Sequence, residues 1–231
     1  MPRNKLPTAG ASLTLAEVIV TLVLVAIPTV WGKIGATPNS GLSESSLNGA
    51  SLIVAGHVKS KGPSFLAETA SEGRSYSGRW QVVTFEVDHV LRGKEVSAVE
   101  IQIFHPIDSS RTLEFDCLDR DQRYIICLKS CESEDLKGWQ LVATLGSAVP
   151  STIMPDAKTI KGRSFSEKME AEFLTMLKAK SVQERSAALV SIGNLTVLTP
   201  ALLEAVEAAR HDSNSWVQLL ADALWKRVGG D

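Results

Sequence analysis

The sequence predicts an α+β protein in which a β domain precedes a helical region. Between residues 51 and 145, hydrophobic side chains recur at every second position, which is the period of half-buried strands. From residue 164 onward the hydrophobic period changes to about 3.6, as in amphipathic helices. A run of strands followed by a run of helices is typical of α+β folds.

Five segments carry the strand pattern. They are residues 51–58, 79–89, 98–104, 123–129 and 139–145. Val83, Phe85 and Val87 alternate with polar residues, whereas residues 124–128 form a continuous apolar run of the fully buried kind. Five strands joined by turns predict a small barrel or sandwich over residues 51–150. The Gly-, Ser- and Glu-rich residues 62–78 predict a long loop.

Four helices are expected within residues 164–229. The first two begin with a serine that has a glutamate three residues later, which is the pattern of a capping box. The third has proline in its first turn, and two glycines end the fourth. The expected helix starts are Ser164, Ser181, Thr199 and Ser215. Short connections between them predict antiparallel neighbours.

Residues 1–36 are expected to direct the chain to a membrane. Arg3 and Lys5 precede an apolar run over residues 13–31, which favours export of the part that follows. Residues 18–31 alone have the length of the apolar h-region of a cleavable signal peptide, whereas residues 13–34 together suit a single-span anchor, and both readings stay open. The small polar residues 37–50 predict a linker.

The segment Leu13-Thr14-Leu15-Ala16-Glu17-Val18-Ile19-Val20 resembles the start of type IV pilins and pseudopilins. That resemblance implies an assembly subunit in which Glu17 neutralises the N-terminal amine of a neighbour. The pattern departs from the family at Ser12, where the processing peptidase requires glycine.

The β region resembles exported bacterial domains of the tissue-inhibitor-of-metalloproteinase or netrin type. Three stretches carry the likeness: residues 51–58, 83–93 and 123–128. The resemblance implies an OB-like five-stranded barrel. Animal members inhibit proteases through an N-terminal cysteine, but the first cysteine here is Cys117, so protease inhibition does not carry over.

The helical end is similar to HEAT-type repeats. Residues 217–229 match the second helix of such a repeat, with Gln218 where arginine is usual, and residues 184–193 are an earlier copy. Two repeats are fewer than a free-standing solenoid needs, so the resemblance implies a repeat pair that packs on the barrel or on a partner.

Composition argues against several functions. The formal net charge is −2, and residues 51–150 carry 11 basic against 14 acidic residues, so nucleic acid is a poor partner. No metal or cofactor is expected, because His57, His89, His105 and His211 lack a ligand spacing. The acids between Glu114 and Asp121 predict polar turns, with a weak calcium site as the alternative.

Three cysteines, Cys117, Cys127 and Cys131, lack the spacing of zinc or redox sites. Cys127 lies in an apolar run and is expected to fill the core, while a disulfide between Cys117 and Cys131 stays open.

These observations predict a non-enzymatic binding or scaffold protein at the bacterial cell envelope, with a protein partner and no cofactor. It would be either a single-pass membrane protein with an extracytoplasmic body or a periplasmic or secreted protein. The alternatives are an envelope hydrolase with an unrecognised dyad and a pseudopilin-like subunit. Trp216 and Trp225 flank the main apolar stripe of the last helix, so they are the expected binding residues.

Overall fold

The computed structural model describes residues 41–71, 74–106, 118–120, 122–132, 137–142, 147–156, 160 and 162–229. They belong to one compact unit, Thr37–Asp231. The predicted signal or anchor segment, its pilin-like stretch and Cys117 lie outside the described residues. None of the helices in the described part is both long and apolar enough to cross a bilayer.

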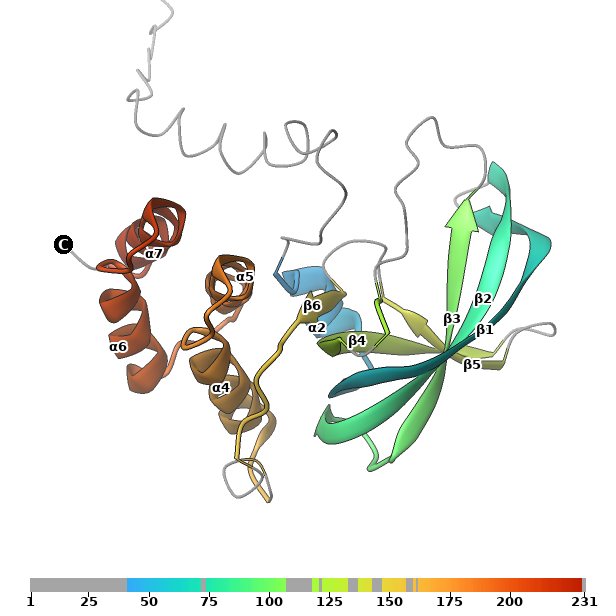
Figure 1. Cartoon of the computed structure of the whole chain (residues 1–231), viewed down its shortest axis with the longest axis horizontal. Helices are drawn as coiled ribbons and strands as arrows, with labels where there is room; N and C mark the ends of the chain where they lie inside the picture. The colour runs from blue at the N-terminus through green and yellow to red at the C-terminus, as the bar shows by residue number, and fades with distance from the viewer. Residues whose placement is uncertain are drawn as a thin grey trace, which may run out of the picture. The chain divides into compact units, whose positions relative to one another are not determined.

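The fold is α+β, as predicted, with one six-stranded mixed sheet (Figure 1). The strands are β1 (Leu52–Ser71), β2 (Arg74–Arg92), β3 (Ala98–Pro106), β4 (Arg123–Glu132), β5 (Lys137–Leu141) and β6 (Ala148–Pro150). Antiparallel pairs join β1 to β2, β2 to β3, β5 to β4 and β4 to β1, and a parallel pair joins β3 to β5. Five strands therefore form a nearly closed ring, and β6 adds to β4.

Alternate residues of β1 and β4 face two different cores. Val54 and Ile126 pack with Phe85 and Ile101 in a cluster contributed mainly by the ring strands. Ile53 and Ile125 pack instead with the helices in a second cluster. Because successive side chains of a strand point to opposite faces, strands buried on both faces read as continuous apolar runs. The run at residues 124–128 has this cause.

The prediction of a long loop at residues 62–78 is wrong. Ser64 pairs with Gln81 and Ala67 with Gly78, so β1 and β2 continue as a long antiparallel hairpin. Main-chain hydrogen bonds hold such a hairpin together without an apolar face, so the polar composition gave no sign of it. Phe65 and Leu66 on this hairpin are exposed.

Much of the expected linker at residues 37–50 is built into the body. Residues 44–49 form helix α2 (Glu44–Gly49), and Ser43 accepts a hydrogen bond from the N–H of Ser46 as its N-cap. Leu42 is completely buried, and Leu47 is nearly so. Two isolated leucines among polar residues show no strand or helix period, which explains why the composition predicted a linker.

The four predicted helices are present as α4 (Phe165–Met176), α5 (Val182–Gly193), α6 (Pro200–Ala209) and α7 (Ser215–Arg227). Ser164 and Glu167 form the predicted capping box, and Thr199 caps α6. α7 begins at Ser215, as predicted, and its N-cap is Asn214, whose side chain accepts from two N–H groups of the first turn. α4 contacts α5 and α6, and α7 contacts α5 and α6.

Candidate docking surface

A buried ion pair joins the sheet to the helices. Arg123 on β4 donates to Glu172 on α4 from Nη1 at 2.9 Å and from Nη2 at 2.7 Å. Its Nε donates to Asp88 on β2 at 3.0 Å, and its Nη1 also reaches Oγ of Ser151 at 2.8 Å. Glu172 is completely buried. Glu172 therefore links the sheet to a helix, whereas Asp88 connects β4 to β2 within the sheet.

The ion pair also favours the charged form of Arg123 inside the body. Burial by itself would lower the pKa of this guanidinium, but its hydrogen bonds and its attraction to Glu172 and Asp88 outweigh burial and raise the pKa above the usual value. Arg123 is therefore a permanent cation that two carboxylates balance, and its role is to hold the junction.

A second buried carboxylate binds the chain that follows β6. Glu184 accepts from both the N–H and the hydroxyl of Thr152, at 2.5 Å each. Its backbone N–H donates to Ser181, but its side chain does not complete the predicted capping box. A carboxylate that accepts hydrogen bonds from another segment cannot also return to its own helix start.

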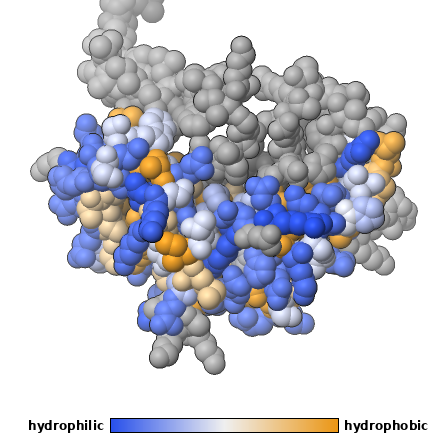
Figure 2. Space-filling view, viewed as in Figure 1, coloured by the Kyte–Doolittle hydropathy of each residue, from blue (hydrophilic) through white to orange (hydrophobic). Residues whose placement is uncertain are grey.

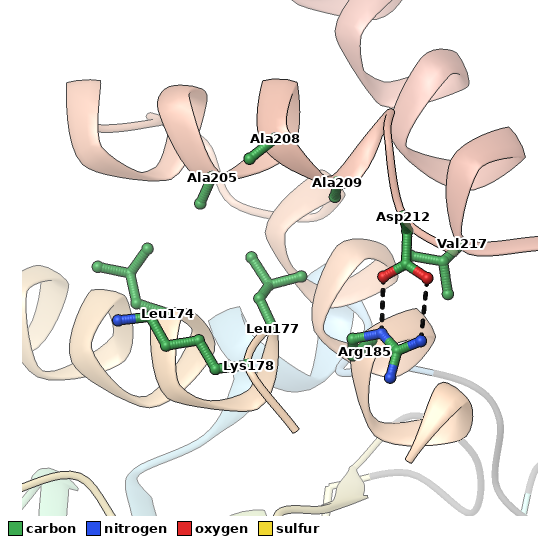
Figure 3. A pocket seen from close by; sticks show the side chains of 9 residues that line it. All are labelled: Leu174, Leu177, Lys178, Arg185, Ala205, Ala208, Ala209, Asp212 and Val217. Atoms are coloured by element: carbon green, nitrogen blue, oxygen red, sulfur yellow. Dashed lines mark hydrogen bonds and ion pairs between the residues drawn. The ribbon is translucent and has the colours of Figure 1, made fainter. Parts of the chain in front are cut away.

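A groove lies between α4 and α6 (Figure 3). Its volume is about 270 Å³. The figure shows Leu174 of α4 and Leu177, the C-cap residue of that helix, facing the alanines of α6 across it. The lining residues are Leu174, Leu177, Lys178, Arg185, Ala205, Ala208, Ala209, Asp212 and Val217. Because alanine side chains are short, the α6 wall leaves space that larger side chains would fill.

One end of the groove is charged. Arg185 donates to Asp212 from Nε at 2.8 Å and from Nη2 at 2.9 Å (Figure 3). Burial would raise the pKa of Asp212, but the hydrogen bonds from Arg185 and from the N–H of Asn214 outweigh it and hold the pKa below its usual range. This pair neutralises itself, so exposed Lys178 is the cation that the groove offers to an incoming carboxylate.

The two tryptophans predicted to bind a partner do not share a face. Trp225 comes nine positions after Trp216, and at 3.6 residues per turn this spacing places the two on opposite sides of α7. Trp225 packs against the helical core, and the guanidinium of Arg210 lies 5.6 Å from its ring centre. Trp216 is half-buried on the other side, where Leu219 is exposed. Neither tryptophan lines the groove.

Other exposed apolar side chains are scattered. They are Phe65, Leu66, Ile153, Met154, Val197, Leu219 and Val228 among the described residues. On the face drawn in Figure 2, apolar residues form small groups among hydrophilic ones. The α4–α6 groove combines an apolar lining with an ionic rim.

The histidines and cysteines are placed as follows. Nε2 of His57 lies 3.6 Å from Glu86, and Nδ1 lies 3.8 Å from Asp88, with the side chain 41% exposed.

Cys127 is completely buried, as predicted for core filler, and Cys127 and Cys131 carry free thiols. Within the described part of the chain, no group of three or more His, Cys, Asp or Glu side chains could hold a metal ion. Most of the acidic segment considered for calcium lies outside that part.

The sequence did not reveal the groove. Arg185 and Asp212 are 27 residues apart, and the alanines of α6 look like ordinary helix formers in the sequence. Comparison with known proteins adds no relative: no family model, curated protein or solved structure matches the chain. The function is therefore argued from the residues of this chain.

Proposed function

We propose that this chain is a non-enzymatic binding or scaffold protein of the bacterial cell envelope, and that the α4–α6 groove takes a segment of a protein partner. Residues 1–36 would export the body or tether it to the membrane. The observation that carries the proposal is the groove itself, where leucines and alanines form the lining and Lys178 stands at the rim. An apolar side chain next to a carboxylate is the partner chemistry that suits it.

The fold supports this use of the helices. A nearly closed ring of five strands is consistent with an OB-like barrel. Contact of α4 with α6, and of α5 with α7, is consistent with two HEAT-like repeats whose equivalent helices stack. In such an arrangement the barrel supports the first repeat, and the groove runs between the first helices of the two repeats.

The buried charges support a non-catalytic reading. Arg123, Glu172 and Glu184 are each hydrogen-bonded to another segment of the body, and each link joins the sheet or its continuation to a helix. Charged groups that hold a junction in this way use their hydrogen bonds within the body and do not present them to a substrate.

Filling the groove tests the binding proposal. In Ala208→Trp, a bulky side chain replaces an exposed alanine of the lining. We expect the chain, gently solubilised from membranes, to migrate in a complex on a native gel and to lose that complex in this variant. The matched control is Glu207→Trp, an exposed position of α6 that points away from the three alanines of the lining. A complex that survives Ala208→Trp, or a wild type that migrates alone, would contradict the proposal.

The location is tested separately. Alkaline phosphatase is fused after residue 231 of the full chain, because residues 42–50 belong to the body and a fusion within them would disrupt it. Phosphatase activity in whole cells is expected, since the enzyme is active only after export. An inactive fusion found in the cytosol would contradict an envelope location.

A further inference from the structure

The chain enters the body at the C-terminal end of α5. Leu42 donates its N–H to Oγ of Ser191 at 2.8 Å, and its carbonyl accepts from Nδ2 of Asn194 at 2.9 Å. A Cβ at Gly41 would lie 2.5 Å from the carbonyl oxygen of Ala187 and 2.5 Å from the N–H nitrogen of Ser191. Only glycine fits so close to a helix backbone. The entry point is therefore fixed on α5.

The distance from this entry point to the predicted membrane segment is short. Residues 35–40 alone separate Gly41 from Ile34, the last residue of the stretch that suits a membrane anchor. Even fully extended, these seven Cα steps span about 25 Å. If residues 1–36 stay in a bilayer, the C-terminal end of α5 is therefore held close to the bilayer surface.

The surface around the entry point combines exposed valines with cations. Val197, in the connection from α5 to α6, is 76% exposed, and Val228 at the end of α7 is 39% exposed. Lys226 and Arg227 are exposed in the last turn of α7. Arg227 lies against α5, since a Cβ at Gly193 would be 3.4 Å from its Nη2. Glu44 of α2, which follows the entry point, is an exposed carboxylate. Its single negative charge is smaller than the two positive charges of Lys226 and Arg227.

We propose that Val197, Val228, Lys226 and Arg227, here called the entry surface, lie on the headgroup layer of an anionic phospholipid bilayer. Lysine and arginine near such a layer are attracted to lipid phosphates, and small apolar side chains enter the boundary below them. The inference rests on the proposed tethering and adds the face of the body that meets the membrane. The short connection makes the contact intramolecular in effect, so modest attraction suffices.

The test uses the full chain in vesicles. Cys117 and Cys131 are replaced by serine, and an environment-sensitive fluorophore is attached to a Val197→Cys variant. The vesicles contain phosphatidylcholine with or without phosphatidylglycerol, and a lipid-bound nitroxide serves as quencher. Gln183→Cys is the matched control, because Gln183 is exposed at the other end of α5, about 15 Å along the helix axis.

We expect the probe at position 197, but not the probe at 183, to shift to the blue and to be quenched when phosphatidylglycerol is present. Joint replacement Lys226→Glu and Arg227→Glu should lower the ratio of docked to undocked chain by roughly thirty-fold, whereas Lys180→Glu should leave it unchanged. Equal signals from positions 197 and 183 in a chain that resists carbonate extraction would overturn the entry surface alone. Release of the chain by carbonate would overturn the tethering, and the inference with it.

Discussion

Glu172 of α4 holds the guanidinium of Arg123 of β4 through two hydrogen bonds, 2.9 Å and 2.7 Å long, inside the body. The pair connects the last third of the chain to the sheet. A buried charge that loses its partner is costly, whereas an apolar pair of similar volume is often tolerated. The junction therefore depends on both members being present.

The first prediction tests this dependence. Arg123→Met should lower the free energy of unfolding by about 3–5 kcal/mol, because it leaves Glu172 buried without a counter-charge. Glu172→Leu should cost less, because Arg123 keeps Asp88 as a counter-charge at 3.0 Å. The double variant should be more stable than Arg123→Met, because it no longer buries an unpaired carboxylate on α4. Urea denaturation of all four proteins measures the coupling, and strictly additive losses would show that the pair does not act as a unit.

The second prediction concerns pH. The pKa of Asp212 is lower in the folded chain than the value of about 3.9 for an unfolded aspartate, so the unfolded chain binds more protons in acid. The stabilisation by its charge is fully present above that value and is lost as the pH falls through the lower, folded pKa. The difference in unfolding free energy between wild type and Asp212→Asn should therefore shrink in acid.

Asp222→Asn is the control for Asp212. Asp222 also pairs with an arginine, Arg210, at 2.7 Å, but its side chain is 44% exposed. Removing an exposed pair should cost less than about 1 kcal/mol. A difference between wild type and Asp212→Asn that stays constant from neutral pH into acid would contradict the role given to the Arg185 pair.

The third prediction concerns thiol reactivity. Burial raises the pKa of Cys127 to about 12, although the positive charge of Arg92 acts in the opposite direction. Because the thiolate is the reactive form, Cys127 should resist alkylation at pH about 8 until the chain unfolds. Half-buried Cys131 should react in the folded chain. Mass spectrometry of alkylated peptides separates the sites, and rapid modification of Cys127 in the native protein would contradict its burial.

The fourth prediction separates the two tryptophans. Trp225→Ala should lower the free energy of unfolding by about 2 kcal/mol, because the ring packs on the helical core beneath Arg210. Trp216→Ala should cost less than about 1 kcal/mol. Sedimentation of both variants shows whether either ring holds copies of the chain together. A larger loss of stability from Trp216→Ala would reverse the assignment.

Regular hydrophobic patterns predicted most of the fold. The alternation in Val83, Phe85 and Val87 marked β2, and the caps at Ser164 and Thr199 marked α4 and α6. Such signals are local, because a strand or helix shows its period within a few residues. The polar arm of β1 and β2 shows no such period, since main-chain pairing rather than an apolar face holds it. β6 has three residues, too few to show a period although Ala148 and Val149 are buried.

Several contacts that hold the body together join residues far apart in the chain, and the sequence alone did not predict them. Glu184 looks like half of a capping box, but its carboxylate binds Thr152, which lies 32 residues earlier. Leu42 looks like part of a linker, but Ser191, 149 residues away, accepts its N–H. Pairings over such separations follow from the packed fold, so periodicity and capping rules do not find them.

The central claim is that the α4–α6 groove holds a protein partner at the envelope. The most direct measurement places a photo-cross-linking amino acid at Ala208 of the full chain in intact cells, with the same probe at exposed Glu207 on another face of α6 as control. We expect a discrete adduct with another protein from Ala208, its loss when Lys178→Glu is added, and no such adduct from Glu207. No adduct from Ala208, or the same adducts from both positions, would contradict this claim.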